Sequence, residues 1–213
     1  MPLSDPIAWA WEQVARLGAI KPGSRRAARF GAFGPKTVVC FPVAALFGER
    51  YIRLGGGSVI GPYSTLSAGV GPDQMLDQEC VIRIGDRCVI GKGSAIVGHT
   101  SVEIGDDVWT GPHVYVTDAN HGYEDVTVPI GVQFAANEPV RIGAGSWLGT
   151  GVVVLPGTTI GRHVVVGAGA VVADDLPDNT VAVGNPARVV RKYEEGKWVS
   201  VGSDGHPPTS SSR

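Results

Sequence analysis

The feature that most constrains the fold of this chain is a repeat of six residues. From Ile142 the sequence divides into IGAGSW, LGTGVV, VLPGTT, IGRHVV and VGAGAV, and hexads of the same pattern run from Leu54, Ile84 and Ile104. Three hexads run from each of these three positions, which with the five from Ile142 makes fourteen. Thirteen of the fourteen begin with an aliphatic residue, and ten have glycine as their second residue. An amphipathic helix repeats near 3.6 residues and a two-faced strand at two, so neither explains this period.

A period of six fits short strands joined by sharp bends, with three strands forming each coil of a triangular solenoid. The aliphatic residue then points inward and stacks on its equivalents in neighbouring coils, as does the small fifth residue. Glycine tolerates the backbone angles of bends, which accounts for its abundance of 31 residues. Coils pair through their backbones at about 4.8 Å, so the fold is all-β and needs a cap at each end of the stack.

The repeat also divides the chain into regions, and 213 residues suggest one domain with appendages. We expect an N-terminal cap segment over residues 1–50, in which residues 5–18 form a short amphipathic helix. The solenoid covers 51–175 and extrudes a loop at 122–141. Residues 176–200 close the solenoid, and 201–213 form a disordered tail.

Charge and cysteine content exclude several classes of function. The formal net charge of −2 argues against general nucleic-acid binding, which requires many cations. The N-terminus lacks the pattern of a signal peptide, and no apolar run approaches the ~20 residues of a membrane span, so we expect a cytoplasmic protein. Cys40, Cys80 and Cys88 suggest neither a disulfide framework nor a metal site, and a thiol acyl-enzyme is not expected.

A basic segment follows the expected helix. Residues 16–36 contain six lysines and arginines and no acid. We interpret this segment as a solvated cap over the first coil. Contact with an anionic membrane surface is the weaker alternative.

The tandem [LIV]-G-x-x-[STAV]-x hexads resemble those of the hexapeptide-repeat acyltransferases over about residues 51–192. This resemblance implies a left-handed parallel β-helix. It also implies a homotrimer with each active site between two subunits. The outward-facing Trp109, Tyr115 and Trp147 favour an oligomer independently, because a monomer would expose their apolar surface.

The repeat breaks at VTDANHGYED, residues 116–125, where a histidine stands at the root of the extruded loop. The pattern D-x-N-H-x-Y-x-D followed by P-I resembles the sugar O-acetyltransferase branch, which includes maltose and galactoside acetyltransferases. That resemblance implies that His121 is the general base that deprotonates an acceptor hydroxyl as it attacks acetyl-CoA. Imidazole, with an ordinary pKa near 6.5, suits proton transfer at neutral pH.

The resemblance further implies residues that bind the acceptor. His99 lies near the position where relatives place a polar acceptor-binding residue. Trp147 matches a tryptophan that flanks the active site, although it could instead pad an interface between subunits. Asp118 and Asn120 either orient the imidazole of His121 or cap the turn.

Five residues are implied in binding of the acetyl-CoA donor. The backbones of Thr150 and Ala168 match positions that bind the pantetheine arm. GNPARVVRK ends the solenoid and supplies Pro186 to the donor site, with Arg188 and either Arg191 or Lys192 near the phosphates, a task that suits arginine. Many relatives have Thr-Lys where this chain has Ala173 and Asp174, so one expected cation is missing.

These residues predict an acetyl-CoA-dependent O-acetyltransferase that acts on a sugar or sugar-containing acceptor and needs no metal. An N-acyltransferase acting on an amino sugar is the main alternative, because it uses the same base and donor. A zinc enzyme like the γ-class carbonic anhydrases would use three histidines, such as His99, His113 and His121. Their spacing of eight between the closer pair, instead of the five of that family, disfavours it. A non-catalytic scaffold is the last alternative. We expect His113 to be structural, and we assign no role to His163 or His206.

Overall fold

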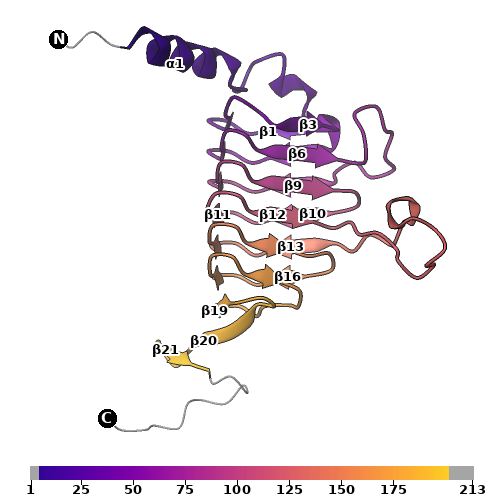
Figure 1. Ribbon diagram of the computed structural model, residues 1–213. Coiled ribbons are helices and arrows are strands. Elements are labelled where there is room, and N and C mark those ends of the chain that lie inside the picture. Colours follow the sequence, from indigo (N-terminus) through magenta and orange to yellow (C-terminus); the bar gives the residue numbers. More distant parts are fainter. Residues whose placement is uncertain (1–4, 202–213) are drawn as a thin grey trace.

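The computed structural model describes residues 5–201 and confirms a parallel β-helix with three flat walls. Its coils stack along one axis, with helix α1 (Pro6–Gly18) at one end and an antiparallel hairpin at the other (Figure 1). The predicted tail falls almost wholly on residues 202–213, which lie outside the described residues, as does His206. None of the described helices is long and apolar enough to cross a membrane.

Each wall is a stack of short strands, one from each coil. The first wall consists of β1 (Ala32–Phe33), β4 (Ile52–Leu54), β7 (Ile82–Ile84), β10 (Val102–Ile104), β13 (Val140–Ile142) and β16 (Thr159–Ile160). The second wall consists of β2 (Val38–Val39), β5 (Val59–Ile60), β8 (Val89–Ile90), β11 (Trp109–Thr110), β14 (Trp147–Leu148), β17 (Val165–Val166) and β19 (Thr180–Val183). The third wall consists of β3 (Ala45–Phe47), β6 (Thr65–Ala68), β9 (Ala95–Gly98), β12 (Tyr115–Thr117), β15 (Val153–Val154) and β18 (Val171–Val172).

The residues that begin the hexads form the core. Ile84, Ile104 and Ile142 stack in register on the first wall, and each is at most 2% exposed. Full burial of such a side chain contributes about 1.5–3 kcal/mol, and the same contact recurs in every coil. The core therefore extends along the whole stack.

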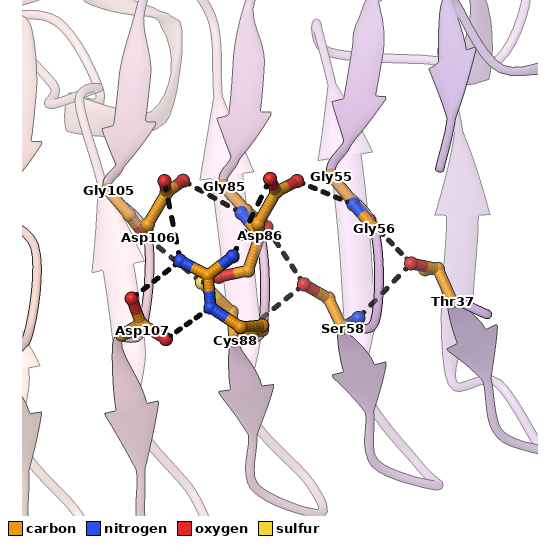
Figure 2. A network of polar contacts seen from close by, with 11 residues as sticks. Thr37, Gly55, Gly56, Ser58, Gly85, Asp86, Cys88, Gly105, Asp106 and Asp107 are labelled. Atoms are coloured by element: carbon orange, nitrogen blue, oxygen red, sulfur yellow. Dashed lines mark hydrogen bonds and ion pairs between the residues drawn. The ribbon is translucent and has the colours of Figure 1, made fainter. Parts of the chain in front are cut away.

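The small fifth residue of the hexad adds a hydrogen-bonded column inside the same walls. The Ser58 hydroxyl donates to the Gly85 carbonyl at 2.8 Å and accepts the Cys88 amide at 2.9 Å. Figure 2 shows this column continuing from Thr37 through Ser58 to Cys88. Because each side chain pairs with backbone of the next coil, no buried hydroxyl remains unsatisfied there. Cys88 occupies the fifth position of its hexad and is fully buried, as expected for that position.

The outer faces of the three walls differ in chemistry. On the second wall the outward residues, in register from coil to coil, are all apolar: Val38, Val59, Val89, Trp109, Trp147, Val165 and Val181. The equivalent residues of the third wall are Ala45, Thr65, Ala95, Tyr115, Val153 and Val171. On the first wall they are mostly charged: Ala32, Arg53, Arg83, Glu103, Arg141 and Thr159. Only the first wall has the polar outer face that water favours.

The solenoid begins earlier than the boundary expected from the sequence. β1, β2 and β3 pair with β4, β5 and β6, so a complete coil lies inside the expected cap of residues 1–50. FGPKTV, residues 33–38, is a hexad whose first residue is aromatic instead of aliphatic. Its Thr37 occupies the fifth position and is fully buried. What caps this coil is the segment up to about residue 31, which includes a 3-10 helix (Ala27–Arg29).

The opposite end closes with a change of strand direction. β19 continues the second wall in parallel, but β20 (Arg188–Glu194) and β21 (Lys197–Ser200) add to it antiparallel. Between the ends, two loops project from the same side of the stack (Figure 1). One is residues 69–81, between β6 and β7. The other is residues 118–139, between β12 and β13, and contains a 3-10 helix (Ile130–Val132).

Candidate functional site

A cleft of about 1080 Å³ lies against the third wall and is bordered by both projecting loops. Val97 and Tyr115 of the wall line it, together with Leu76 from the first loop and Phe134 from the second. His121 also lines the cleft, at the point where the second loop leaves the coil. The solenoid wall therefore gives this cavity a rigid floor, and the loops give it sides.

The His121 side chain is held by the returning strand of its own loop. Its Nδ1 lies 3.2 Å from the Gln133 carbonyl, and His121 forms an isolated antiparallel bridge with Phe134. The rings of His121 and Phe134 are 6.2 Å apart between centroids. Because a carbonyl only accepts hydrogen bonds, this contact favours a proton on Nδ1 in the neutral imidazole and leaves the lone pair of Nε2 free. This tautomer suits an imidazole that takes up a proton.

Gln133, which the sequence analysis did not single out, organises the loop. Its side-chain amide donates to the carbonyls of Asp125 and Val128 at 2.9 and 2.8 Å, and its oxygen accepts the Asp125 amide at 3.3 Å. Its backbone carbonyl accepts the Gly122 amide at 3.0 Å besides facing His121. Gln133 thus links both arms of the loop to the imidazole. No hexad periodicity marks this position, so the sequence offered no signal for it.

Hydrogen bonds also hold the turn around Asp125. The hydroxyl and backbone amide of Thr127 both donate to Oδ1 of Asp125, at 2.7 and 2.9 Å. These bonds favour the ionised carboxylate and lower the pKa of Asp125 below its ordinary value. The turn is therefore best formed when Asp125 is charged.

The structure places Asp118 away from the cleft, inside the coil. Its side chain is fully buried, and its carboxylate accepts the amides of His99, Thr100 and Ser101 at 2.7, 2.7 and 2.6 Å. Of the two roles that the sequence left open, this geometry corresponds to capping a turn, here the turn of the preceding coil. Asp118 is thereby out of reach of an acceptor. It contributes to the site through His99, whose backbone it holds.

The other three residues expected to contact the acceptor fall into two groups. His99 and Asn120 line the cleft together with His121. The Asn120 side-chain oxygen also accepts the His121 backbone amide at 2.9 Å. Trp147 lies on the second wall, where it pairs in register with Trp109 and is 50% exposed. Within one subunit, Trp147 therefore faces away from the cleft.

The expected donor-binding residues lie outside the cleft, towards the C-terminal end of the stack. Thr150 and Ala168 occupy the corner between the second and third walls in successive coils, and the Gly169 amide donates to the Thr150 carbonyl at 2.8 Å. They form an exposed column along that corner. Pro186 lies in the turn after β19, and Arg191 lies on β20.

Arg188 forms an ion pair with Asp174, the residue that stands where many relatives have lysine. Its guanidinium donates to the Asp174 carboxylate at 2.7 Å, and both side chains are more than 60% exposed. A pair so exposed is held weakly. An anionic ligand can therefore compete with Asp174 for Arg188.

The three cysteines and His113 do not line the cleft. Burial raises the pKa of Cys40, Cys80 and Cys88, which keeps these thiols protonated and poorly nucleophilic. His113 occupies the turn between β11 and β12, at a different corner from His121. Within residues 5–201, no three His, Cys, Asp or Glu side chains lie close enough to hold a metal ion.

Two family descriptions match the repeats. "Hexapeptide repeat of succinyl-transferase" matches residues 81–117, and "Bacterial transferase hexapeptide (six repeats)" matches residues 139–174. These ranges lie on either side of the 118–139 loop. The hexads that define the three walls are therefore those of this family, and the loop is an insertion between them.

Relatives with assigned activities extend the likeness. An Escherichia coli protein designated a putative lipopolysaccharide biosynthesis O-acetyl transferase is 36% identical over 150 residues, which is 67% of this chain and 76% of the relative. The galactoside O-acetyltransferase of Lactococcus lactis is 39% identical over 114 residues, 50% of this chain and 54% of the enzyme. A Mycobacterium tuberculosis protein designated a probable acetyltransferase is 44% identical over 113 residues, and the match covers 53% of this chain but only 38% of that protein.

Among solved structures, an N-acyltransferase from Bacillus cereus in complex with dTDP and 3-hydroxybutyryl-CoA superposes with a TM-score of 0.66. The match covers 79% of this chain and 86% of that one at 20% identity. Identity this low supports the fold alone. The left-handedness implied by the family resemblance is thereby confirmed, and the stack is a left-handed parallel β-helix.

Proposed function

The chain belongs to the hexapeptide-repeat transferases, and we propose that it is an acetyl-CoA-dependent O-acetyltransferase acting on a sugar or sugar-containing acceptor. The observation that carries this proposal is the contact between Nδ1 of His121 and the Gln133 carbonyl. The imidazole is anchored through Nδ1 to a backbone carbonyl, and its ring lines a cleft large enough for a small acceptor. The O-acetyltransferase assignments of the relatives in Escherichia coli and Lactococcus lactis support the reaction class.

In the proposed reaction, Nε2 of His121 removes the proton of an acceptor hydroxyl while that oxygen attacks the thioester carbonyl of acetyl-CoA. The tetrahedral intermediate collapses with cleavage of the carbon–sulfur bond. The thiol of CoA leaves with the proton that the imidazolium returns, and the acceptor leaves as an acetyl ester. No covalent enzyme intermediate is needed, because the thioester is already activated and the enzyme has only to position two substrates.

The cleft suits a compact polar acceptor. His99, Asn120 and Glu138 offer hydrogen-bonding groups around the cleft, and Tyr115 and Phe134 offer apolar ring surface. A sugar presents hydroxyl groups around its rim and apolar ring faces, so this lining matches both parts. We assign acceptor binding to His99 and Asn120.

For the donor, we propose that the pantetheine arm of acetyl-CoA follows the exposed column of Thr150 and Ala168. Arg188 would then meet a phosphate at the C-terminal end, with Pro186 and Arg191 nearby. Asp174 competes for Arg188, which weakens phosphate binding there without preventing it. The absence of the lysine that many relatives have in place of Asp174 would further lower the affinity for CoA.

We further propose a homotrimer, in which the apolar outer faces of the second and third walls are covered by neighbouring subunits. Trp109 and Trp147 are 57% and 50% exposed in one subunit and lie side by side. Contiguous apolar surface of this kind marks an interface. In the trimer, Trp147 would pad the subunit contact and could border the cleft of a neighbour. This agrees with its orientation away from the cleft of its own subunit.

The test of the catalytic proposal is acetyl transfer by His121→Ala. Turnover, measured as release of free CoA thiol with a panel of free, nucleotide-linked and amino sugars, should fall about 10²- to 10⁴-fold, the usual contribution of a general base. Binding of CoA should be nearly unchanged. His113→Ala is the matched control, because it removes an imidazole from another corner, and it should retain turnover. Near-normal turnover of His121→Ala would refute the proposal and direct attention to His99.

N-acylation of an amino sugar remains the second candidate, and Glu138 is the observation that favours it. This carboxylate lines the cleft and could hold a protonated amine before it is deprotonated. The same panel distinguishes the two reactions. Preference for amino sugars, abolished by Glu138→Gln, would favour N-acylation, and preference for neutral sugars would favour O-acetylation.

A further inference from the structure

The N-terminal helix exposes apolar side chains that the solenoid does not cover. None of the residues of α1 is buried, and Ile7 and Leu17 are 79% and 83% exposed. Val14 and Trp11 lie on the same face at 47% and 51% exposure, and Trp9 on the other side is 58% exposed. Soluble helices normally bury such a face against the protein. The exposed apolar face of α1 is therefore available to a binding partner.

The helix is nonetheless fixed in place at its C-terminal end. The Trp11 ring lies 6.4 Å from the ring of Phe41, and Gly18 packs so closely on Phe41 that a side chain there would clash. The Asp5 side chain accepts the Ile7 amide at 2.9 Å and caps the N-terminus. The exposed face of α1 is therefore presented in a defined orientation at one end of the stack (Figure 1).

Positive charge gathers beside this face. No acidic residue occurs between Glu12 and Glu49, and the same span contains six basic side chains: Arg16, Lys21, Arg25, Arg26, Arg29 and Lys36. Arg29 is paired with Glu49, and Arg26 donates to the Gly18 carbonyl. Lys21 and Arg25 are exposed and form no ion pair within residues 5–201.

We propose that α1 and residues 19–29, together the N-terminal docking surface, bind the surface of an anionic lipid membrane. Apolar side chains next to cations are what the boundary between lipid headgroups and acyl chains accommodates, with tryptophan favoured at that boundary. A second copy of the chain is a poorer partner, because pairing two of these surfaces would bring like charges together. Nucleic acid would use the cations but would leave the apolar face uncovered.

The position of the docking surface is compatible with the rest of the molecule. It lies at the N-terminal end of the stack, whereas the loops that border the cleft project from the side (Figure 1). Membrane contact therefore leaves the cleft and the apolar outer faces of the walls open. In the proposed homotrimer, three docking surfaces would lie at the same end, and simultaneous contact would strengthen binding well beyond that of one copy.

The test is co-sedimentation of the full chain with vesicles of equal parts phosphatidylglycerol and phosphatidylcholine, compared with vesicles of phosphatidylcholine alone. The protein should sediment with the mixed vesicles and be released by salt. Each cation near an anionic surface contributes about fivefold to partitioning, so Lys21→Gln/Arg25→Gln should weaken binding about 25-fold. The matched control is Arg162→Gln/Lys197→Gln, which removes the same charge elsewhere and should change binding little.

A second variant examines the apolar face. Ile7→Ser/Leu17→Ser alters two side chains that are already exposed, so the fold should be retained and vesicle binding should fall at least about tenfold. Acetyl transfer in solution should be unchanged in both docking variants, which separates this proposal from the catalytic one.

Three results would overturn the proposal. The first is the absence of binding to either type of vesicle. The second is an equal loss of binding in the control variant, which would indicate a response to net charge only. The third is a change, without lipid, in the molecular mass of Ile7→Ser/Leu17→Ser measured by sedimentation equilibrium, which would show that α1 packs against another subunit.

Discussion

Replacing Asp118 by asparagine tests whether this residue is structural. The buried carboxylate holds three consecutive amides of the preceding coil, those of His99, Thr100 and Ser101. Asparagine has nearly the same size but only one accepting oxygen. The substitution therefore removes hydrogen bonds without leaving a cavity.

The magnitude follows from the three bonds. The remaining oxygen would satisfy Thr100 and Ser101, which share Oδ2 in the native protein, and the new NH₂ group would face the His99 amide. Losing one hydrogen bond to a charged group costs about 1.5–3 kcal/mol, and converting the other two from charged to neutral acceptors costs up to about 1 kcal/mol each. We expect the free energy of unfolding to fall by about 3 kcal/mol, a large part of the 5–15 kcal/mol typical of a domain.

The assay is urea unfolding at one fixed protein concentration, because the stability of an oligomer depends on concentration. Asp86→Asn is the matched control. Asp86 accepts the Gly56 amide at 2.7 Å from a half-exposed position, and asparagine can keep that single bond. Its unfolding free energy should change by less than about 1 kcal/mol. Unchanged stability of Asp118→Asn, combined with a raised KM for the acceptor, would refute the structural role.

Three further predictions concern other parts of the molecule. Asp174→Asn should release Arg188 and tighten CoA binding a few-fold by calorimetry, since the ion pair is exposed and weak; unchanged affinity would mean that Arg188 does not meet the phosphates. Trp147→Arg should lower the mass observed in sedimentation equilibrium by placing a charge on the apolar second wall, and an unchanged trimer would contradict that interface. Cys40 and Cys80 should react slowly with a thiol reagent at neutral pH and faster as the pH rises, because burial raises the pKa of both thiols; fast labelling at neutral pH would contradict their burial.

The sequence predicted the architecture of the stack because the fold repeats a local rule. Each aliphatic residue that begins a hexad, such as Ile84 or Ile142, stacks in register on its equivalents in the adjacent coils. A pattern of six residues therefore specifies both the turn positions and the core. The rule failed at the first coil, where Phe33 replaces the aliphatic residue and conceals a hexad that is otherwise regular.

The site was predictable only where the chain carries its own motif. His121 and Asn120 stand in a recognisable pattern at the loop root, and both line the cleft together with His99. Asp118 belongs to the same pattern, but its side chain faces the interior, where it accepts a backbone amide of the preceding coil. Sequence spacing alone does not reveal which side of the wall a residue faces once the repeat has broken.

What the sequence determined by itself was the six-residue period, and with it the solenoid, the residues of its core and the point at which a loop leaves the wall. Only the tertiary structure showed the contact that orients the imidazole of His121, since Gln133 lies twelve positions away and meets the imidazole only when the loop folds back. It also showed that two walls are apolar outside and one is charged, because that contrast appears only when coils are aligned in register. The local repeat can be recognised in the sequence, whereas contacts across a loop or between coils form only when the chain folds.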